Sequence, residues 1–80
     1  MPFGRVDDPA RLDFEAQARA LLKGELKRRG TTYRALSEKL EAIGVNETER
    51  NLANKISRGG FKASFFLQCM RALSVEELRL

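Results

Sequence analysis

The 80-residue chain contains no histidine and a single cysteine, Cys69. Zinc sites built from histidine and cysteine need three or four such ligands, so this class of metal site is excluded. Catalytic triads that rely on an imidazole base are excluded for the same reason. A disulfide within the chain needs a second cysteine, which favours a reduced, cytoplasmic protein. We therefore expect no enzyme, no catalytic residue, no bound metal and no cofactor.

Long apolar runs and strand patterns are also missing. No apolar run approaches the length of about 18 residues that a membrane-spanning helix requires, so we expect no membrane partner. β-branched residues are sparse, and apolar and polar residues do not alternate over the length of a strand. Apolar residues make up 42% and charged residues 32% of the chain, which is typical of a globular protein. The sequence predicts one small all-α domain.

The net charge of +4 is distributed unevenly along the chain. Residues 17–75 carry twelve basic and five acidic side chains, whereas the segments on either side are slightly acidic. The window from Arg50 to Lys62 contains four basic residues and no acidic one. A basic patch of this kind is typical of proteins that bind nucleic acid.

Apolar residues recur at three- and four-residue spacing, which predicts helices almost throughout. The first helix extends to about Arg29, and two starts fit equally well, one at the Asp8–Pro9 pair and one capped by Asp13. Its apolar stripe consists of Phe14, Ala18, Leu21, Leu22 and Leu26. Glu25 lies within this stripe, and we expect it to form an ion pair with Arg29 or with a basic residue of another helix.

The second and third helices are joined through Gly44, which is typical of a helix-turn-helix. Thr32 is a favourable N-cap for the second helix. Asn46 is the expected N-cap of the third helix, residues 47–57, with Glu49 at the capping-box position. The inward-facing residues of the two helices are Leu36, Leu40, Ile43, Leu52 and Ile56.

A fourth helix is predicted over residues 62–73, and Ser74 is expected to cap a final turn over residues 75–79. The apolar residues of the fourth helix form a broad buried face, namely Phe65, Phe66, Cys69, Met70 and Leu73. Two adjacent phenylalanines cannot both point into one narrow stripe. Either both lie in the core, or one is partly exposed and available for self-association.

The outward side of the third helix is polar and basic. At about 100° per residue, it carries Glu47, Arg50, Asn51, Asn54 and Arg58, with Lys55 on the flank. Asparagine pairs with the major-groove edge of adenine and arginine with that of guanine, and lysine and arginine also contact phosphates. The alternative interpretation is an ordinary solvated face, because any surface helix of a basic protein carries such residues.

Several segments resemble the lambda-repressor-like helix-turn-helix superfamily. The run GTTYRALSEKL from Gly30 resembles the start of its helix-turn-helix, LLKGELKRRG resembles its first helix, and ISRGGF with FFLQCMRALSVEEL resembles its later part. The segments ELKRRGTTY, NLANKISRG and FFLQC also resemble a small bacterial family of uncharacterised domains. One departure is the spacing from Ser37 to Gly44, which is longer than usual and predicts about one extra turn or a longer connection.

The resemblance implies a compact domain of four to five helices over residues 13–80, preceded by an N-terminal arm over residues 1–12. It also implies a DNA-binding role for specific residues. Thr32 and Tyr33 would meet the phosphate backbone at the start of the second helix, although packing of the Tyr33 ring on the first helix is an equal alternative. Arg50, Asn51, Asn54 and Lys55 would lie on the recognition helix, and Arg58 and Lys62 would contact phosphates.

We therefore expect a sequence-specific protein that binds double-stranded DNA, a small bacterial or phage transcriptional regulator located in the cytoplasm on the nucleoid. A homodimer through the C-terminal tail or the fourth helix is expected, because a single module covers about half a site. The alternative is a protein-interaction module, an antitoxin or an adaptor that reuses the same fold. RNA binding ranks last, because the chain offers few aromatic residues for base stacking.

Overall fold

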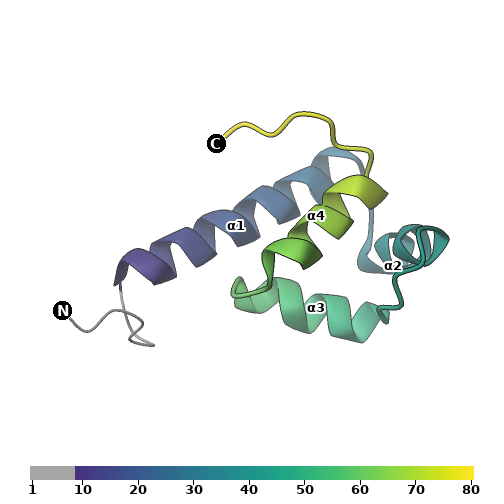
Figure 1. Ribbon diagram of the computed structural model, residues 1–80, viewed down its shortest axis with the longest axis horizontal. Coiled ribbons are helices and arrows are strands. Elements are labelled where there is room, and N and C mark those ends of the chain that lie inside the picture. Colours follow the sequence, from purple (N-terminus) through teal and green to yellow (C-terminus); the bar gives the residue numbers. More distant parts are fainter. Residues whose placement is uncertain (1–8) are drawn as a thin grey trace.

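Four α-helices make up most of residues 9–80, the part of the chain that the computed structural model describes (Figure 1). They are α1 (Pro9–Arg28), α2 (Tyr33–Ala42), α3 (Glu49–Arg58) and α4 (Ala63–Ala72). The described part contains no strand, so the predicted all-α class is confirmed. The predicted N-terminal arm lies outside the described residues up to residue 8, and its last four residues, 9–12, form the first turn of α1.

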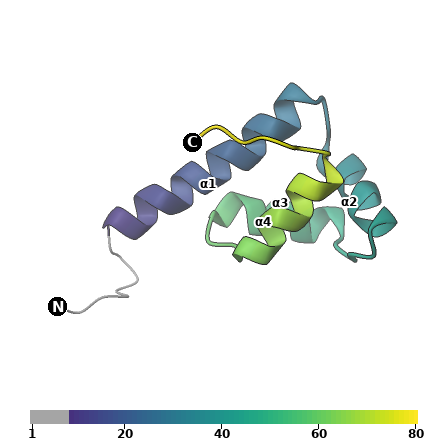
Figure 2. The ribbon, with the colours of Figure 1, turned by 45° about the horizontal axis from the view of Figure 1, so that its top comes forward.

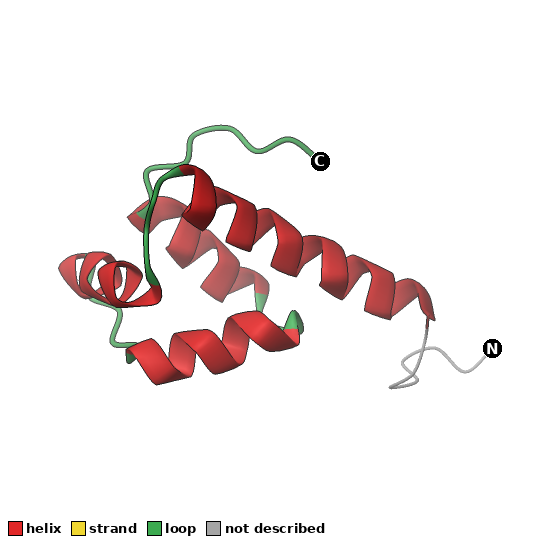
Figure 3. Ribbon diagram, turned by 180° about the vertical axis from the view of Figure 1, so that it is seen from behind, coloured by secondary structure: helices red, strands yellow, loops and turns green. Residues whose placement is uncertain are grey.

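The four helices pack around one core. Both α1 and α2 pack against α3 and α4, and Figure 1 shows α4 in front, with α1 above it and α3 below it in that view. Seen from behind, only short loops join the helices (Figure 3). The core consists of Leu22, Leu26, Leu36, Leu40, Leu52, Ile56, Phe65, Cys69, Met70 and Leu73. All ten were predicted to face inward, and that prediction is confirmed.

Three of the helices end in the same hydrogen-bonded motif. After α1, the Thr31 N–H donates to the Leu26 carbonyl, and Gly30 adopts a φ of +60°. After α2, the Val45 N–H donates to the Leu40 carbonyl around Gly44. These bonds satisfy carbonyls that the helix end leaves unpaired, and the left-handed residue suits glycine because it has no Cβ. The predicted stops at Gly30 and Gly44 are confirmed.

Ser74 occupies the left-handed position of the same motif at the end of α4. Its φ is 60°, and the Val75 N–H donates to the Met70 carbonyl. The prediction that Ser74 caps a further turn over residues 75–79 is wrong, because this residue ends α4 instead of starting a helix. The tail beyond it has no regular secondary structure and crosses over α1 (Figure 2).

Threonines cap both central helices. The Thr32 hydroxyl accepts a hydrogen bond from the Ala35 N–H at 3.1 Å, as predicted. The cap of α3 is Thr48, whose hydroxyl accepts from the Asn51 N–H at 3.0 Å, so the prediction of Asn46 is wrong. The Ser37 hydroxyl donates to the Glu47 carbonyl. This bond holds the connection against α2, and α3 begins only after Glu47.

Two residues predicted to face inward are exposed. Phe14 is 70% exposed and Ile43 is 44% exposed. The cause is the length of the neighbouring helices: α1 has 20 residues whereas α3 and α4 have ten each, so the first turns of α1 project beyond them (Figure 1). Ile43 is the C-cap of α2 at the edge of the core. Helical spacing predicts which side of a helix is apolar, but not whether another helix packs against that side.

Aromatic packing and one buried carboxylate complete the core. The Phe61 ring lies 5.5 Å from the Phe65 ring and stacks on Phe66 at 6.1 Å, centroid to centroid. Phe65 is buried and Phe66 partly buried. Glu25 is 4% exposed and forms salt bridges with Arg28 at 2.9 Å and with Arg29 at 3.2 Å, so the predicted ion pair with Arg29 is confirmed.

Candidate nucleic-acid interface

The outward side of α3 is fully accessible. Leu52 and Ile56 attach the helix to the core with no exposed surface. On the other side, the predicted base-reading residues Arg50, Asn51 and Asn54 are all exposed. The N-cap bond of Thr48 uses only the backbone N–H of Asn51, so the amide side chain is left for other contacts. The structure therefore presents three side chains with the right hydrogen-bonding groups for base edges on one exposed surface.

Glu47 does not belong to this surface, contrary to the prediction. It precedes α3, and its carboxylate forms an ion pair with Lys55. The Lys55 ammonium also lies 5.1 Å from the centroid of the Phe65 ring. Lys55 is thus drawn toward α4 and away from Asn51 and Asn54, so its charge is partly neutralised within the protein.

A cationic hollow lies where α3 ends and α4 begins. Its volume is about 340 Å³, and its lining includes three cations, Lys55, Arg58 and Lys62, and one carboxylate, Glu47, which is paired with Lys55. Within the described part of the chain, Arg58 and Lys62 form no salt bridge. Lys62 is the N-cap of α4 but makes no side-chain capping bond. The first N–H groups of a helix carry a partial positive charge, which adds to that of the two free cations.

Ser64 and Gln68 also line this hollow, and they are absent from the predicted site. Both lie on α4 at a spacing of four residues, which places them on one face of that helix. Their polar side chains stand between the apolar positions of α4, and this pattern is visible in the sequence. The pattern indicates a site only because α4 lies beside the end of α3, and this proximity depends on the tertiary structure.

Thr32 and Tyr33 lie in a different place from the cationic hollow. Together with Lys23, Leu26 and Lys27 of α1, they line a separate hollow at the start of α2. Tyr33 is partly buried and packs against the core, which agrees with the alternative that its ring packs on α1. The predicted site is therefore divided into three parts, namely the exposed side of α3, the cationic hollow and the start of α2.

Cys69 is not a chemically active group of this region. Its side chain has no exposed surface. Burial, reinforced by the nearby Glu47 carboxylate and partly offset by Lys55, raises the pKa of the Cys69 thiol to about 12. A thiol needs to ionise to act as a nucleophile or metal ligand, so this cysteine has a packing role.

Residues 9–80 contain no cluster of three or more histidine, cysteine, aspartate or glutamate side chains placed to hold a metal ion. None of the four helices is long and apolar enough to cross a membrane.

These features define a small four-helix domain that presents one polar and basic helix to solvent. The chain belongs to the DUF6471 family, described as a domain of unknown function, whose model matches residues 14–78. Comparisons with curated proteins and with solved structures give no match.

Proposed function

We propose that this protein binds double-stranded DNA sequence-specifically and acts as a small transcriptional regulator, with α3 in the major groove. The observation that carries the proposal is the exposed side of α3, where Arg50, Asn51 and Asn54 lie together and lead into the cationic hollow at Arg58 and Lys62. Asparagine and arginine supply base-specific hydrogen bonds, and the hollow supplies charge for the backbone.

The arrangement of α2 and α3 supports this proposal. The two helices are connected by residues 43–48 and pack against each other. Figure 1 shows α2 nearly end-on while α3 lies across the view, so they cross steeply. In a helix-turn-helix, such a crossing allows the second helix to enter the groove while the first lies across the backbone. The resemblance of residues 30–40 to a helix-turn-helix points the same way.

The test begins with duplex binding measured by fluorescence anisotropy at several salt concentrations. Four to six phosphate contacts give a slope of log K against log salt of about −4 to −6 per monomer. Duplexes selected from a random pool then define the preferred sequence. No binding at low salt, or binding that does not change with salt, would overturn the proposal, and an acidic protein partner would then be the better explanation of the cationic hollow.

Two double variants separate reading of bases from binding to the backbone. Asn51→Ala/Asn54→Ala is expected to abolish preference for the selected sequence while keeping binding to random duplex. Arg58→Ala/Lys62→Ala is expected to weaken binding to all sequences and to reduce the salt slope by about 2. Arg71→Ala is the control, because it removes an exposed arginine at the other end of α4 from Lys62. Equal effects of Arg71→Ala would show that only net charge matters.

A further inference from the structure

An aromatic side chain on α1 is largely exposed in the monomer. Phe14 is 70% exposed, far more than the other phenylalanines among the described residues, which are buried or partly buried. It lies in the second turn of α1 and lines one hollow together with Phe61 and Phe66. Leu80, at 90%, is also exposed and lines the same apolar hollow as Phe14. Large exposed apolar side chains that lie together indicate an interaction surface.

A second exposed surface begins beside Phe14 and continues along α1. We call it the α1 outer face, and it consists of Asp13, Gln17, Ala20, Gly24 and Lys27, all exposed. The spacing of four and three residues is that of helices packed side by side. At about 100° per residue, this face points away from Leu22 and Leu26, which anchor α1 to the core.

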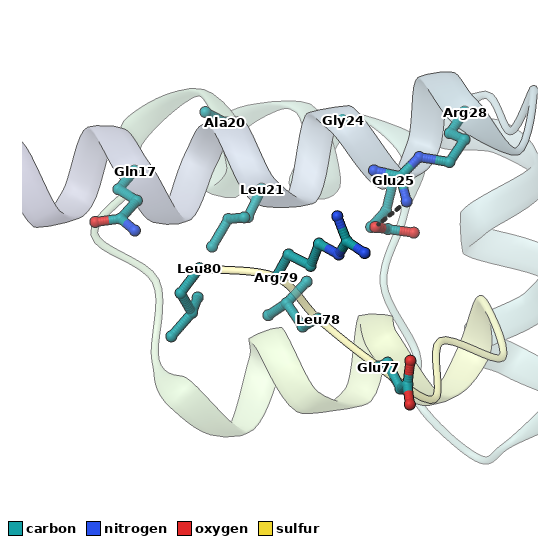
Figure 4. A pocket seen from close by; sticks show the side chains of 10 residues that line it. All are labelled: Gln17, Ala20, Leu21, Gly24, Glu25, Arg28, Glu77, Leu78, Arg79 and Leu80. Carbon is teal, nitrogen blue, oxygen red and sulfur yellow. Dashed lines mark ion pairs between the residues drawn. The ribbon is translucent and has the colours of Figure 1, made fainter.

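The α1 outer face borders a hollow of about 440 Å³ at its C-terminal half. Leu21, Gly24 and Arg28 of α1 form one side of this hollow, and residues 77–80 of the tail form the other (Figure 4). A Cβ added at Gly24 would meet nothing within 4 Å, so packing inside the monomer does not require glycine there. Glycine in the middle of a helix is destabilising, which makes its presence at this place informative.

The charges of the α1 outer face select a specific partner. Asp13 lies near its N-terminal end, and Lys27 lies near its C-terminal end, followed by Arg28. Within residues 9–80, neither Asp13 nor Lys27 forms a salt bridge. A second copy of α1 in antiparallel orientation would bring Asp13 of each chain beside Lys27 of the other. A parallel copy would place like charges together, which is unfavourable.

We propose that two copies of this chain associate through antiparallel α1 helices that cross near Ala20. Around a twofold axis at that residue, Phe14 of each copy reaches the level of Gly24 to Arg28 of the other copy, and Gly24 and Arg28 line the hollow. Each Phe14 therefore enters the hollow of the other copy, and Ala20 and Gly24 allow the helices to approach closely. The contact is self-complementary, as a twofold interface requires.

This dimer differs from the one expected from the sequence. Its main element is α1, and the C-terminal tail contributes only one wall of the hollow. The α1 outer face points away from the core, so the exposed side of α3 stays accessible in both copies. Association is measured without DNA, so its failure and the failure of the proposed function are distinguishable.

The first test is the mass of the full chain by sedimentation equilibrium over a wide range of concentrations. The expected result is a mass that rises with concentration toward twice 9.1 kDa. Phe14→Ser is expected to weaken association about tenfold or more, because an aromatic side chain that fills a pocket of the partner contributes strongly to such contacts. Leu67→Ser is the control, because Leu67 is 65% exposed on α4 and lies outside the hollows of α1. A chain that stays monomeric overturns the proposal.

Charge reversal tests the antiparallel orientation. Asp13→Lys alone and Lys27→Asp alone each place like charges at both ends of a homodimer, so each is expected to lower its affinity. A mixture of the two variants restores opposite charges at both ends, so a heterodimer is expected to form with an affinity near that of the unmodified chain. A mixture that associates no better than either variant alone would overturn the antiparallel contact.

Gly24→Gln tests the close approach without disturbing the monomer. A Cβ at Gly24 meets nothing within 4 Å, and glutamine favours a helix more than glycine does. The variant is therefore expected to melt at the same temperature or higher at a concentration where the chain is monomeric, yet to lose association. Lys23→Gln is the matched control on the preceding residue. Association that survives Gly24→Gln overturns the proposal.

Discussion

Gly59 stands directly against α1: a Cβ at this position would lie 2.7 Å from the backbone carbonyl oxygen of Glu15. Its φ is +74°, so the close approach coincides with a left-handed turn at the end of α3. At the same place, Arg19 of α1 donates to the Ser57 carbonyl at 3.3 Å. The end of α3, from which the cationic hollow begins, is thus positioned by backbone contact with α1.

Replacement of Gly59 by alanine is expected to be strongly destabilising. The added Cβ combines the strain of a left-handed residue with a clash against backbone, so we expect a loss of about 3 kcal/mol or more in the free energy of unfolding. Gly44→Ala is the matched control, because φ there is +84° but nothing lies within 4 Å; it should cost about 1–2 kcal/mol. Urea denaturation measures both. Equal losses would show that the contact with Glu15 is unimportant.

Ser74→Gly is expected to stabilise the protein. Ser74 ends α4 at a φ of 60°, a position that Gly30 and Gly44 occupy in the equivalent motifs. Glycine adopts this conformation without the steric cost of a Cβ, so the free energy of unfolding should rise by about 1 kcal/mol. The same substitution at Ser64, in the first turn of α4, should lower it by up to about 0.5 kcal/mol. Thermal melting followed by circular dichroism gives the sign of each change.

Two variants test which residue is the N-cap of α3. Thr48→Ala removes the hydroxyl that accepts from the Asn51 N–H, and we expect a loss of about 1 kcal/mol. Asn46→Ala is expected to change stability little, because this residue lies in the connection and not at the cap. Urea denaturation of the two variants decides between them. A larger loss of stability for Asn46→Ala than for Thr48→Ala would show that Asn46 is the N-cap, as the sequence predicted.

Stability in alkaline solution should depend on Cys69. The folded protein keeps the thiol proton to about pH 12, whereas the ordinary pKa is 9.0, so between these values the unfolded chain binds fewer protons. The contribution of this group is complete below about pH 9 and declines above it, by up to about 1.4 kcal/mol per pH unit. Cys69→Ala should show a shallower decline between pH 9 and 11 in denaturant titrations. Identical slopes for the two proteins would contradict the assignment.

Much of the fold was predictable from local patterns. The all-α class, the ten core residues and the stops at Gly30 and Gly44 follow from helical spacing and from the preference of glycine for left-handed turns. Thr32 was predictable as a cap because its hydroxyl acts on residues close in the chain. The predictions that failed, at Asn46 and Ser74, both concern helix boundaries. At a boundary more than one polar residue can serve as the cap, and contacts with α2 or with the preceding turn decide which residue does so.

The sequence by itself determined which residues of α3 face outward, because Leu52 and Ile56 leave only one side of that helix free. Only the tertiary structure decided which charges act together. It joined Lys55 to Glu47, gathered Arg58 and Lys62 beside α4, and left Phe14 largely exposed. The physical reason is that helix periodicity is a local property, whereas ion pairs, hollows and exposure depend on helix lengths and on segments distant in the chain.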